Sequence, residues 1–154
     1  MDRSPSADAR LADREAIRDL LFAYCRSCDA NDPDAVGACF TVDCLADYGP
    51  DARTPGAAAR REQAERDLAS FEATSHLLGN VRIEFDGEDR ARVESVVHAW
   101  HRPRQGEPWT LHARYDDVVV RAAAGWLIAE RRLLVAGVDP PQDGWPFNPL
   151  PRAG

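Results

Sequence analysis

Long alternations of apolar and polar residues, joined by very short turns, constrain this chain more than any other feature of its sequence. Apolar residues alternate with charged ones over residues 81–85, and Asp86-Gly87 then supplies a hairpin turn. A second turn at Ala124-Gly125 separates two further segments of the same kind. Because strands joined by short turns run in opposite directions, this half of the chain predicts an antiparallel sheet. The strands expected after the first turn cover residues 90–101, 109–120 and 126–138.

The beginning of the chain instead has the spacing of an amphipathic helix. Over residues 8–29, apolar residues recur at intervals of three and four positions, and charged residues occupy the other faces. This pattern predicts a helix with one buried side. Its apolar stripe consists of Ile17, Leu20, Leu21, Tyr24 and Cys28.

Two more helices and a short strand are expected before the sheet. Asp32 is suited to cap a short helix, and Pro33 is suited to its first turn. A strand at residues 44–48 follows, and a charged helix at residues 57–71 comes after it. The apolar anchors of that helix are Leu68 and Phe71.

Helices first and strands later is the order of an α+β domain in which helices cover one face of a sheet. We therefore predict a cone-shaped, curved antiparallel sheet wrapped around the N-terminal helices and enclosing a pocket. The domain is expected to cover residues 1–138, followed by an extended Pro-rich tail at residues 139–154. Trp145 and Phe147 of the tail could cover the convex side of the sheet across a subunit boundary, which favours a homodimer or homotrimer.

Charge and composition exclude several classes of function. The net charge of −7 argues against a nucleic-acid partner, because such proteins need a clustered basic surface. All 19 basic residues are arginine, so there is no lysine to form a Schiff base. The chain lacks an apolar run long enough to cross a membrane, and its first residues lack the order of a signal peptide. We therefore expect a cytoplasmic protein with neither a membrane nor a nucleic acid as partner.

The cysteines raise the question of a metal or redox site. Cys25 and Cys28 form a CxxC pair, but they lie inside a helical stretch, and no second CxxC completes a zinc site. A thioredoxin-like site would place the motif at the start of a helix that follows a strand. We expect buried thiols that pack as small apolar groups, and neither a metal nor another cofactor. The four cysteines are Cys25, Cys28, Cys39 and Cys44.

The histidines are the residues best suited to acid–base chemistry near neutral pH. His76 stands at the entry to the first long strand, and His98 and His101 stand near the end of the next one. Side chains alternate along a strand, so His98 and His101 should face opposite sides of the sheet. Pairing through the Asp86-Gly87 hairpin makes His76 a neighbour of one of these two. Each histidine could instead be a strand-end residue that hydrogen-bonds backbone or water.

Three further polar residues have both a structural and a catalytic interpretation. Asp29 ends the first helix, where it could be an ordinary helix-end residue or could orient a histidine and stabilise an imidazolium. Tyr24 and Tyr48 could be core tyrosines with satisfied hydroxyls, or they could polarise a substrate carbonyl in an apolar cavity. Helical spacing alone does not aim Asp29 into the pocket.

These motifs resemble the SnoaL-like branch of the nuclear-transport-factor-2-like superfamily, and within it most resemble scytalone dehydratase and related dehydratases. The resemblance extends over residues 17–138 and rests on the order and spacing of short motifs. It implies the same cone-shaped α+β barrel fold. The stretches that carry it are residues 24–29, 31–34, 46–48, 75–79, 99–101, 125–126 and 130–132.

The resemblance also implies a role for each candidate residue. In the scytalone dehydratase pattern, Asp29 pairs with His76, which acts as the base. Tyr48 helps to activate the carbonyl through water, and His101 flanks the site. The bile-acid dehydratase relatives use a helix tyrosine, which matches Tyr24. Further candidates for substrate binding are His98, His112 and Arg114.

The expected function is therefore that of a cofactor-independent lyase. We expect a dehydratase that uses His/Asp acid–base catalysis on a small, largely apolar carbonyl compound in secondary metabolism or catabolism. A polyketide cyclase or a ketosteroid-type isomerase would use the same base and pocket but retain the oxygen. A non-catalytic ligand-binding protein or an oxygenase small subunit is the alternative from a different class.

Overall fold

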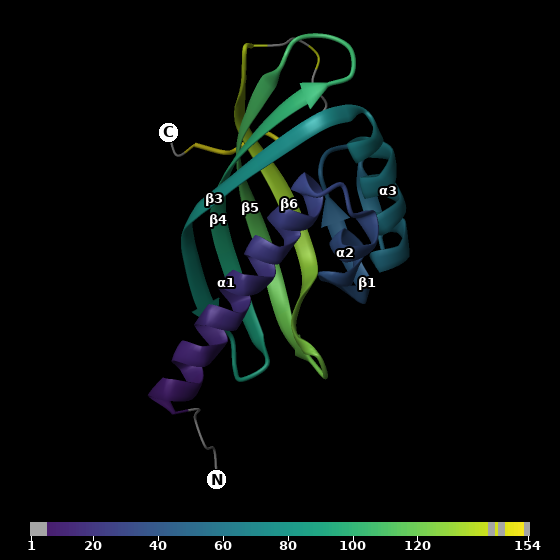
Figure 1. Ribbon diagram of the computed structural model, residues 1–154. Coiled ribbons are helices and arrows are strands. Elements are labelled where there is room, and N and C mark those ends of the chain that lie inside the picture. The colour runs from purple at the N-terminus through teal and green to yellow at the C-terminus, as the bar shows by residue number, and fades with distance from the viewer. Residues whose placement is uncertain (1–5, 142–143, 145–146, 153–154) are drawn as a thin grey trace.

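The computed structural model describes residues 6–141, 144 and 147–152, and its helices lie against one curved, unclosed sheet (Figure 1). The strand order is β2-β1-β6-β5-β4-β3. The α+β architecture with N-terminal helices on a curved sheet is thereby confirmed. The elements in chain order are α1 (Ala7–Asp29), α2 (Pro33–Ala38), β1 (Phe40–Asp47), β2 (Arg53–Pro55), α3 (Ala57–Ala69), β3 (Phe71–Phe85), β4 (Arg90–Pro103), β5 (Trp109–Ala122) and β6 (Gly125–Asp139).

The sheet is mixed rather than wholly antiparallel. Strands β3 to β6 form the expected antiparallel meander, each paired with the next along the chain. Strand β1, however, runs parallel to β6. A parallel pair requires a long connection, and here α3 and the rest of the meander lie between the two strands in sequence.

Alternation along the central strands separates an inner face from an outer face. In β4, the buried residues are spaced two apart, and the charged residues between them are exposed. Small and β-branched side chains on the inner face leave room above the sheet for the helices and for a pocket. The buried residues of β4 are Ala91, Val93, Ser95, Val97 and Ala99.

Strand β3 begins at Phe71, ten residues before the alternation that predicted it. Its first part is rich in small and polar residues and lies at the edge of the sheet, where only one neighbouring strand covers it. The backbone of Asn80 has φ 49, and the pairing with β4 shifts register between Gly79 and Arg82. This irregularity interrupts the alternation, so sequence patterning detects only the later part. His76 therefore lies within a strand and not at its entry.

Helix α1 crosses the concave side of the sheet and buries the predicted apolar stripe (Figure 1). Ser6 caps its first turn by accepting a hydrogen bond from the backbone of Ala9. Ile17, Leu21 and Tyr24 are almost fully buried against the sheet. The helix ends at Asp29, which is thereby carried to the edge of the cone beside β3.

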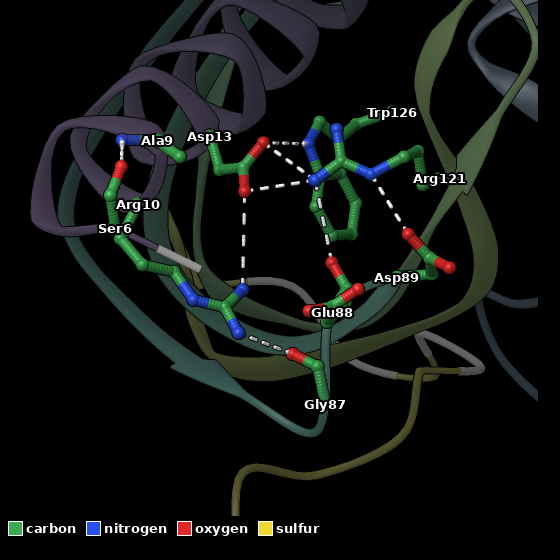
Figure 2. Close-up of polar contacts among 9 residues, drawn as sticks. All are labelled: Ser6, Ala9, Arg10, Asp13, Gly87, Glu88, Asp89, Arg121 and Trp126. Atoms are coloured by element: carbon green, nitrogen blue, oxygen red, sulfur yellow. Dashed lines mark hydrogen bonds and ion pairs between the residues drawn. The ribbon is translucent and has the colours of Figure 1, made fainter. Parts of the chain in front are cut away.

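A polar network ties the N-terminal half of α1 to the turns of the sheet (Figure 2). Nη2 of Arg121 donates to both carboxylate oxygens of Asp13, at 2.8 and 2.9 Å, and the indole N–H of Trp126 donates to Asp13 at 3.2 Å. Arg10 donates to the carbonyl oxygen of Gly87, in the β3–β4 turn, at 2.7 Å. Burial acts to raise the pKa of Asp13, but the bonds from Arg121 and Trp126 outweigh it and lower the pKa. The network fixes how α1 lies on the sheet, far from its C-terminal end.

Helix α3 turns inward the face that carries Leu68, which packs against the core as predicted. The more deeply buried residues of that face are Arg60 and Ala64, and Phe71 belongs to β3 and not to the helix. Ala64 is small enough to let the helix lie close to the core. The methylene stem of Arg60 can pack as an apolar group, which hydropathy patterning does not register.

The C-terminal tail folds back on its own chain. The backbone N–H of Val135 donates to the carbonyl oxygen of Asn148 at 2.8 Å, and that of Leu150 donates to the carbonyl oxygen of Val135 at 2.9 Å. Phe147 packs against the core of its own chain. Trp145 lies outside the described residues. Within the described part of the chain, no helix has the length and apolar character needed to span a membrane.

Candidate active site

A pocket of about 360 Å³ lies on the inner face of the sheet, between α1, α3 and strands β3 to β6. Most of its lining is apolar, which matches the usual composition of small-molecule sites. A larger hollow of about 670 Å³, over β1, β4, β5 and β6, is lined by charged residues of both signs and, in the described chain, by no histidine or tyrosine. We place the site in the smaller pocket because groups that titrate near neutral pH lie there. Its main polar groups are Tyr24, Tyr48, Arg60, His76 and His101.

Asp29 and His76 form a hydrogen-bonded pair at the edge of this pocket. Nδ1 of His76 lies 2.6 Å from Oδ1 of Asp29, and the backbone N–H of His76 donates to Oδ2 at 2.9 Å. The Thr74 hydroxyl donates to Oδ1 at 2.9 Å. Burial acts to raise the pKa of Asp29, but the bonds from His76 and Thr74 outweigh it and hold the pKa below its usual value.

The pair fixes the tautomer of the imidazole. An ionised carboxylate accepts hydrogen bonds but donates none, so the Nδ1 of His76 carries the hydrogen that points to Asp29. The lone pair of the neutral ring is then on Nε2. His76 lines the pocket, and its side chain is 8% exposed, so Nε2 is the nitrogen available to a ligand. This arrangement suits a general base.

His101 is the second histidine of the pocket. Residue Ala99 is paired with His76 and Thr74 with His101, so alternation places both imidazoles on the inner face. Their ring centroids lie 5.9 Å apart, and His101 stacks on Trp109 at 4.0 Å. Burial lowers the pKa of His101 to about 4, and repulsion from a charged His76 adds to the shift. His101 is therefore a neutral ring at physiological pH.

The lowered pKa of His101 predicts an acid-sensitive fold. The unfolded chain binds a proton at His101 below about pH 6.5, whereas the folded chain binds it only below about pH 4. The stability that comes from a neutral His101 is therefore fully present above about pH 6.5 and is lost on acidification. His101→Phe keeps a stacking ring but removes the titration. Between about pH 7 and about pH 4.5, we expect the free energy of unfolding of wild type to fall by on the order of 2 kcal/mol more than that of the variant. Denaturant titrations at both pH values measure this difference, and equal losses would show that His101 is not desolvated.

Tyr24, Tyr48 and Arg60 form a second polar cluster in the pocket. The hydroxyl oxygens of Tyr24 and Tyr48 lie 2.7 Å apart, and Nη2 of Arg60 donates to the Tyr24 hydroxyl at 3.3 Å. The Arg60 guanidinium also lies over the ring of Tyr48, 4.4 Å from its centroid. Burial raises the pKa of Tyr24 well above its usual value, so its hydroxyl stays protonated and can donate a hydrogen bond.

A buried ion pair packs against the rings of the tyrosine cluster. Arg131 donates to both carboxylate oxygens of Asp117, at 2.8 and 2.7 Å, and both side chains are fully buried. The guanidinium packs against the rings of Tyr24 and Tyr115, at 4.2 and 3.9 Å from their centroids. Neither Asp117 nor Arg131 was among the site residues predicted from the sequence. The two residues are directly opposite each other on β5 and β6, and this would have revealed the ion pair. The sequence alone does not show which residues of the two strands are opposite each other.

The candidate binding residues His98, His112 and Arg114 do not reach the pocket, which corrects their expected role there. All three lie on the outer face of the sheet, since their neighbours Ala99, Leu111 and Ala113 face inward. His98 and His112 are paired across β4 and β5, with ring centroids 4.7 Å apart, and Arg114 contacts Asp116. Arg60 also lines the pocket and was not among the site residues predicted from the sequence.

The cysteines are free thiols and are buried in the core. Burial raises the pKa of Cys25 to about 12 and that of Cys28 to about 11, so both stay neutral and pack as small apolar groups. In the described part of the chain, no group of three or more His, Cys, Asp or Glu side chains is arranged to hold a metal ion.

An α+β cone with a pocket of this kind places the chain in the class of proteins with an NTF2-like fold. Within this class the chain belongs to the SnoaL-like domain family, whose domain matches residues 9–132.

Solved structures show the same fold. A provisionally named scytalone dehydratase of Novosphingobium aromaticivorans is 31% identical, with a TM-score of 0.90, over 97% of this chain and 100% of that one. A provisionally named aromatic ring hydroxylase of the same species is 28% identical, with a TM-score of 0.76, over 85% of this chain and 90% of that one. A hexachlorocyclohexane dehydrochlorinase, LinA type 2, shares the fold at 21% identity and a TM-score of 0.81, over 94% of this chain and 98% of that one. A comparison with curated protein sequences finds no match.

Proposed function

We propose that this protein is a cofactor-independent lyase that removes water from a small hydroxy-carbonyl compound. The observation that carries the proposal is the His76 imidazole, held at Nδ1 by an ionised Asp29 and lining an apolar pocket. The 31% identity to a provisionally named scytalone dehydratase over nearly the whole chain supports it.

In the proposed reaction, Nε2 of His76 takes a proton from the carbon beside the carbonyl, and the electrons of that C–H bond form an enolate. Asp29 stabilises the resulting imidazolium. When the enolate collapses, the C–O bond to the hydroxyl on the next carbon breaks. The imidazolium returns its proton to the departing hydroxide, which leaves as water, and an unsaturated carbonyl compound remains. Because the pKa of His101 is about 4, its ring is neutral. His101 therefore lines the pocket but does not act as a general acid.

The tyrosine pair would stabilise the enolate oxygen. Arg60 donates to the Tyr24 hydroxyl, which favours a chain in which Tyr24 donates to Tyr48. Tyr48 is more exposed than Tyr24, so its own O–H is the one left to donate to the ligand. Hydrogen bonds of this kind, fixed before the charge develops, contribute roughly a hundredfold to a thousandfold in rate.

Product mass tests the proposal. Purified protein is incubated with a panel of small β-hydroxy ketones and aldehydes, and products are followed by mass spectrometry. Loss of one water with wild type, but not with His76→Ala or Asp29→Asn, is the expected result. A product of unchanged mass would replace the proposal with an isomerase or cyclase. Conversion of no member of the panel would favour a binding protein.

A further inference from the structure

Arg60 is a buried cation that makes no direct ion pair among the described residues. It is 4% exposed, and its Nε and Nη1 atoms have no hydrogen-bond partner in the described chain. Nη2 makes the one described hydrogen bond of the guanidinium, to the neutral hydroxyl of Tyr24. A guanidinium stays charged in any protein environment, and removing it from water without a counter-charge is costly.

Two of the other charged groups around the pocket are already paired, and a third, Asp67, accepts a hydrogen bond from the neutral side chain of Gln63 at 2.6 Å. Arg131 is paired with Asp117 through two hydrogen bonds, and Asp29 is paired with His76. Arg60, which lines the same pocket, feels the charge of Asp67 but makes no direct ion pair with it or with any other described carboxylate. Arg60 lies on α3, which packs more against β1 and β2 than against β3, the strand that carries His76.

We infer that the pocket takes a substrate with a carboxylate, which Arg60 binds, in addition to the carbonyl group on which His76 acts. A carboxylate supplies the negative charge and the acceptor oxygens that a buried guanidinium with unpaired N–H groups lacks. Its binding would neutralise the buried charge and hold the rest of the molecule toward His76. The inference deepens the proposed function and rests on it for the reaction, but not for the binding preference. It also refines the expected apolar ligand into one with a charged end.

Binding of two probes of matched shape tests the inference without turnover. The probes are 4-acetylbenzoate, which has a ketone and a carboxylate, and 4-acetylbenzamide, in which a neutral amide replaces the carboxylate. Titration calorimetry on wild type is expected to show the carboxylate bound about 10- to 100-fold more tightly than the amide, as charge-assisted hydrogen bonds provide. Equal affinities in wild type would overturn the inference without any variant.

Variants then assign the preference to Arg60. Arg60→Met is expected to lower the affinity for 4-acetylbenzoate to that for the amide, and Arg60→Lys is expected to retain part of the preference. The matched control is Arg66→Met, on the exposed side of the same helix, which should bind both probes as wild type does. A preference that survives in Arg60→Met would overturn the inference.

The two proposals fail separately. His76→Ala removes the proposed base but leaves Arg60 in place, so it should keep the preference for the carboxylate. If the preference is found but no compound is dehydrated, the proposed function fails and the binding inference stands. If neutral hydroxy ketones are dehydrated as fast as their carboxylate analogues, the binding inference fails and the proposed function stands.

Discussion

Replacing His76 by alanine is expected to lower kcat/KM roughly a thousandfold or more while leaving the fold intact. In the proposed reaction the Nε2 lone pair of His76 removes the substrate proton, and alanine has no group that can take its place. Steady-state kinetics on the substrate identified by product mass measure the effect. Circular dichroism and thermal unfolding report whether the variant is folded.

His98 supplies the matched control for this prediction. It is a histidine on an adjacent strand, but its side chain lies on the outer face and does not line the pocket. His98→Ala should therefore leave kcat/KM unchanged. If His98→Ala slows turnover as much as His76→Ala, or if His76→Ala keeps the wild-type rate, the proposed base is wrong.

The pairing with Asp29 adds a test of how the base is oriented. Asp29→Asn replaces an acceptor-only carboxylate by an amide, which can present a donor to Nδ1 and allow the wrong tautomer. Groups that act as a unit are not additive. The double variant should therefore be no slower than His76→Ala alone, and a further loss would mean that Asp29 acts independently of His76.

The elements that place this pair could be predicted from local patterns. The apolar stripe of α1 ends at Asp29, and the hairpin at Asp86-Gly87 fixes that β3 and β4 are neighbours. These are properties of short stretches of sequence. Their consequence, that Asp29 at a helix end can meet a histidine of β3, follows from the fold that the stretches build.

The face on which each histidine lies depends on register, which local patterns leave open. His98 and His101 are three residues apart, so alternation separates them, but it does not say which of them faces inward. The pairing of Ala99 with His76 settles that point in favour of His101. The register shift between Gly79 and Arg82 changes which residues are opposite one another, and no local signal reveals it.

Buried charges are the part of the site that sequence patterning cannot detect. Arg60 and Arg131 both count as polar in a hydropathy pattern and both are placed on an exposed face by it. In the fold, Arg131 is buried because Asp117 lies opposite it, and Arg60 is buried because α3 packs closely over the tyrosines. Their burial depends on partners far away in the sequence.

The buried pair of Asp117 and Arg131 leads to the largest stability effect that we expect. Asp117→Leu should lower the free energy of unfolding by about 3–5 kcal/mol, because it leaves the Arg131 guanidinium buried without its counter-charge. Denaturant titration at neutral pH measures the loss. Since Arg131 packs under Tyr24, the loss should also weaken ligand binding in the pocket.

The two single variants should differ in severity. Burial raises the pKa of Asp117 even though Arg131 opposes the shift, so in Arg131→Met the carboxyl can take up a proton and become neutral. Arginine cannot lose its charge in the same way, and so Asp117→Leu is expected to be the more destabilising of the two. The double variant replaces both charges by apolar groups of similar volume and should recover most of the stability. If the double variant loses as much free energy of unfolding as the two single variants together, the two side chains do not act as a pair. The stability of this part of the pocket would then come from packing alone.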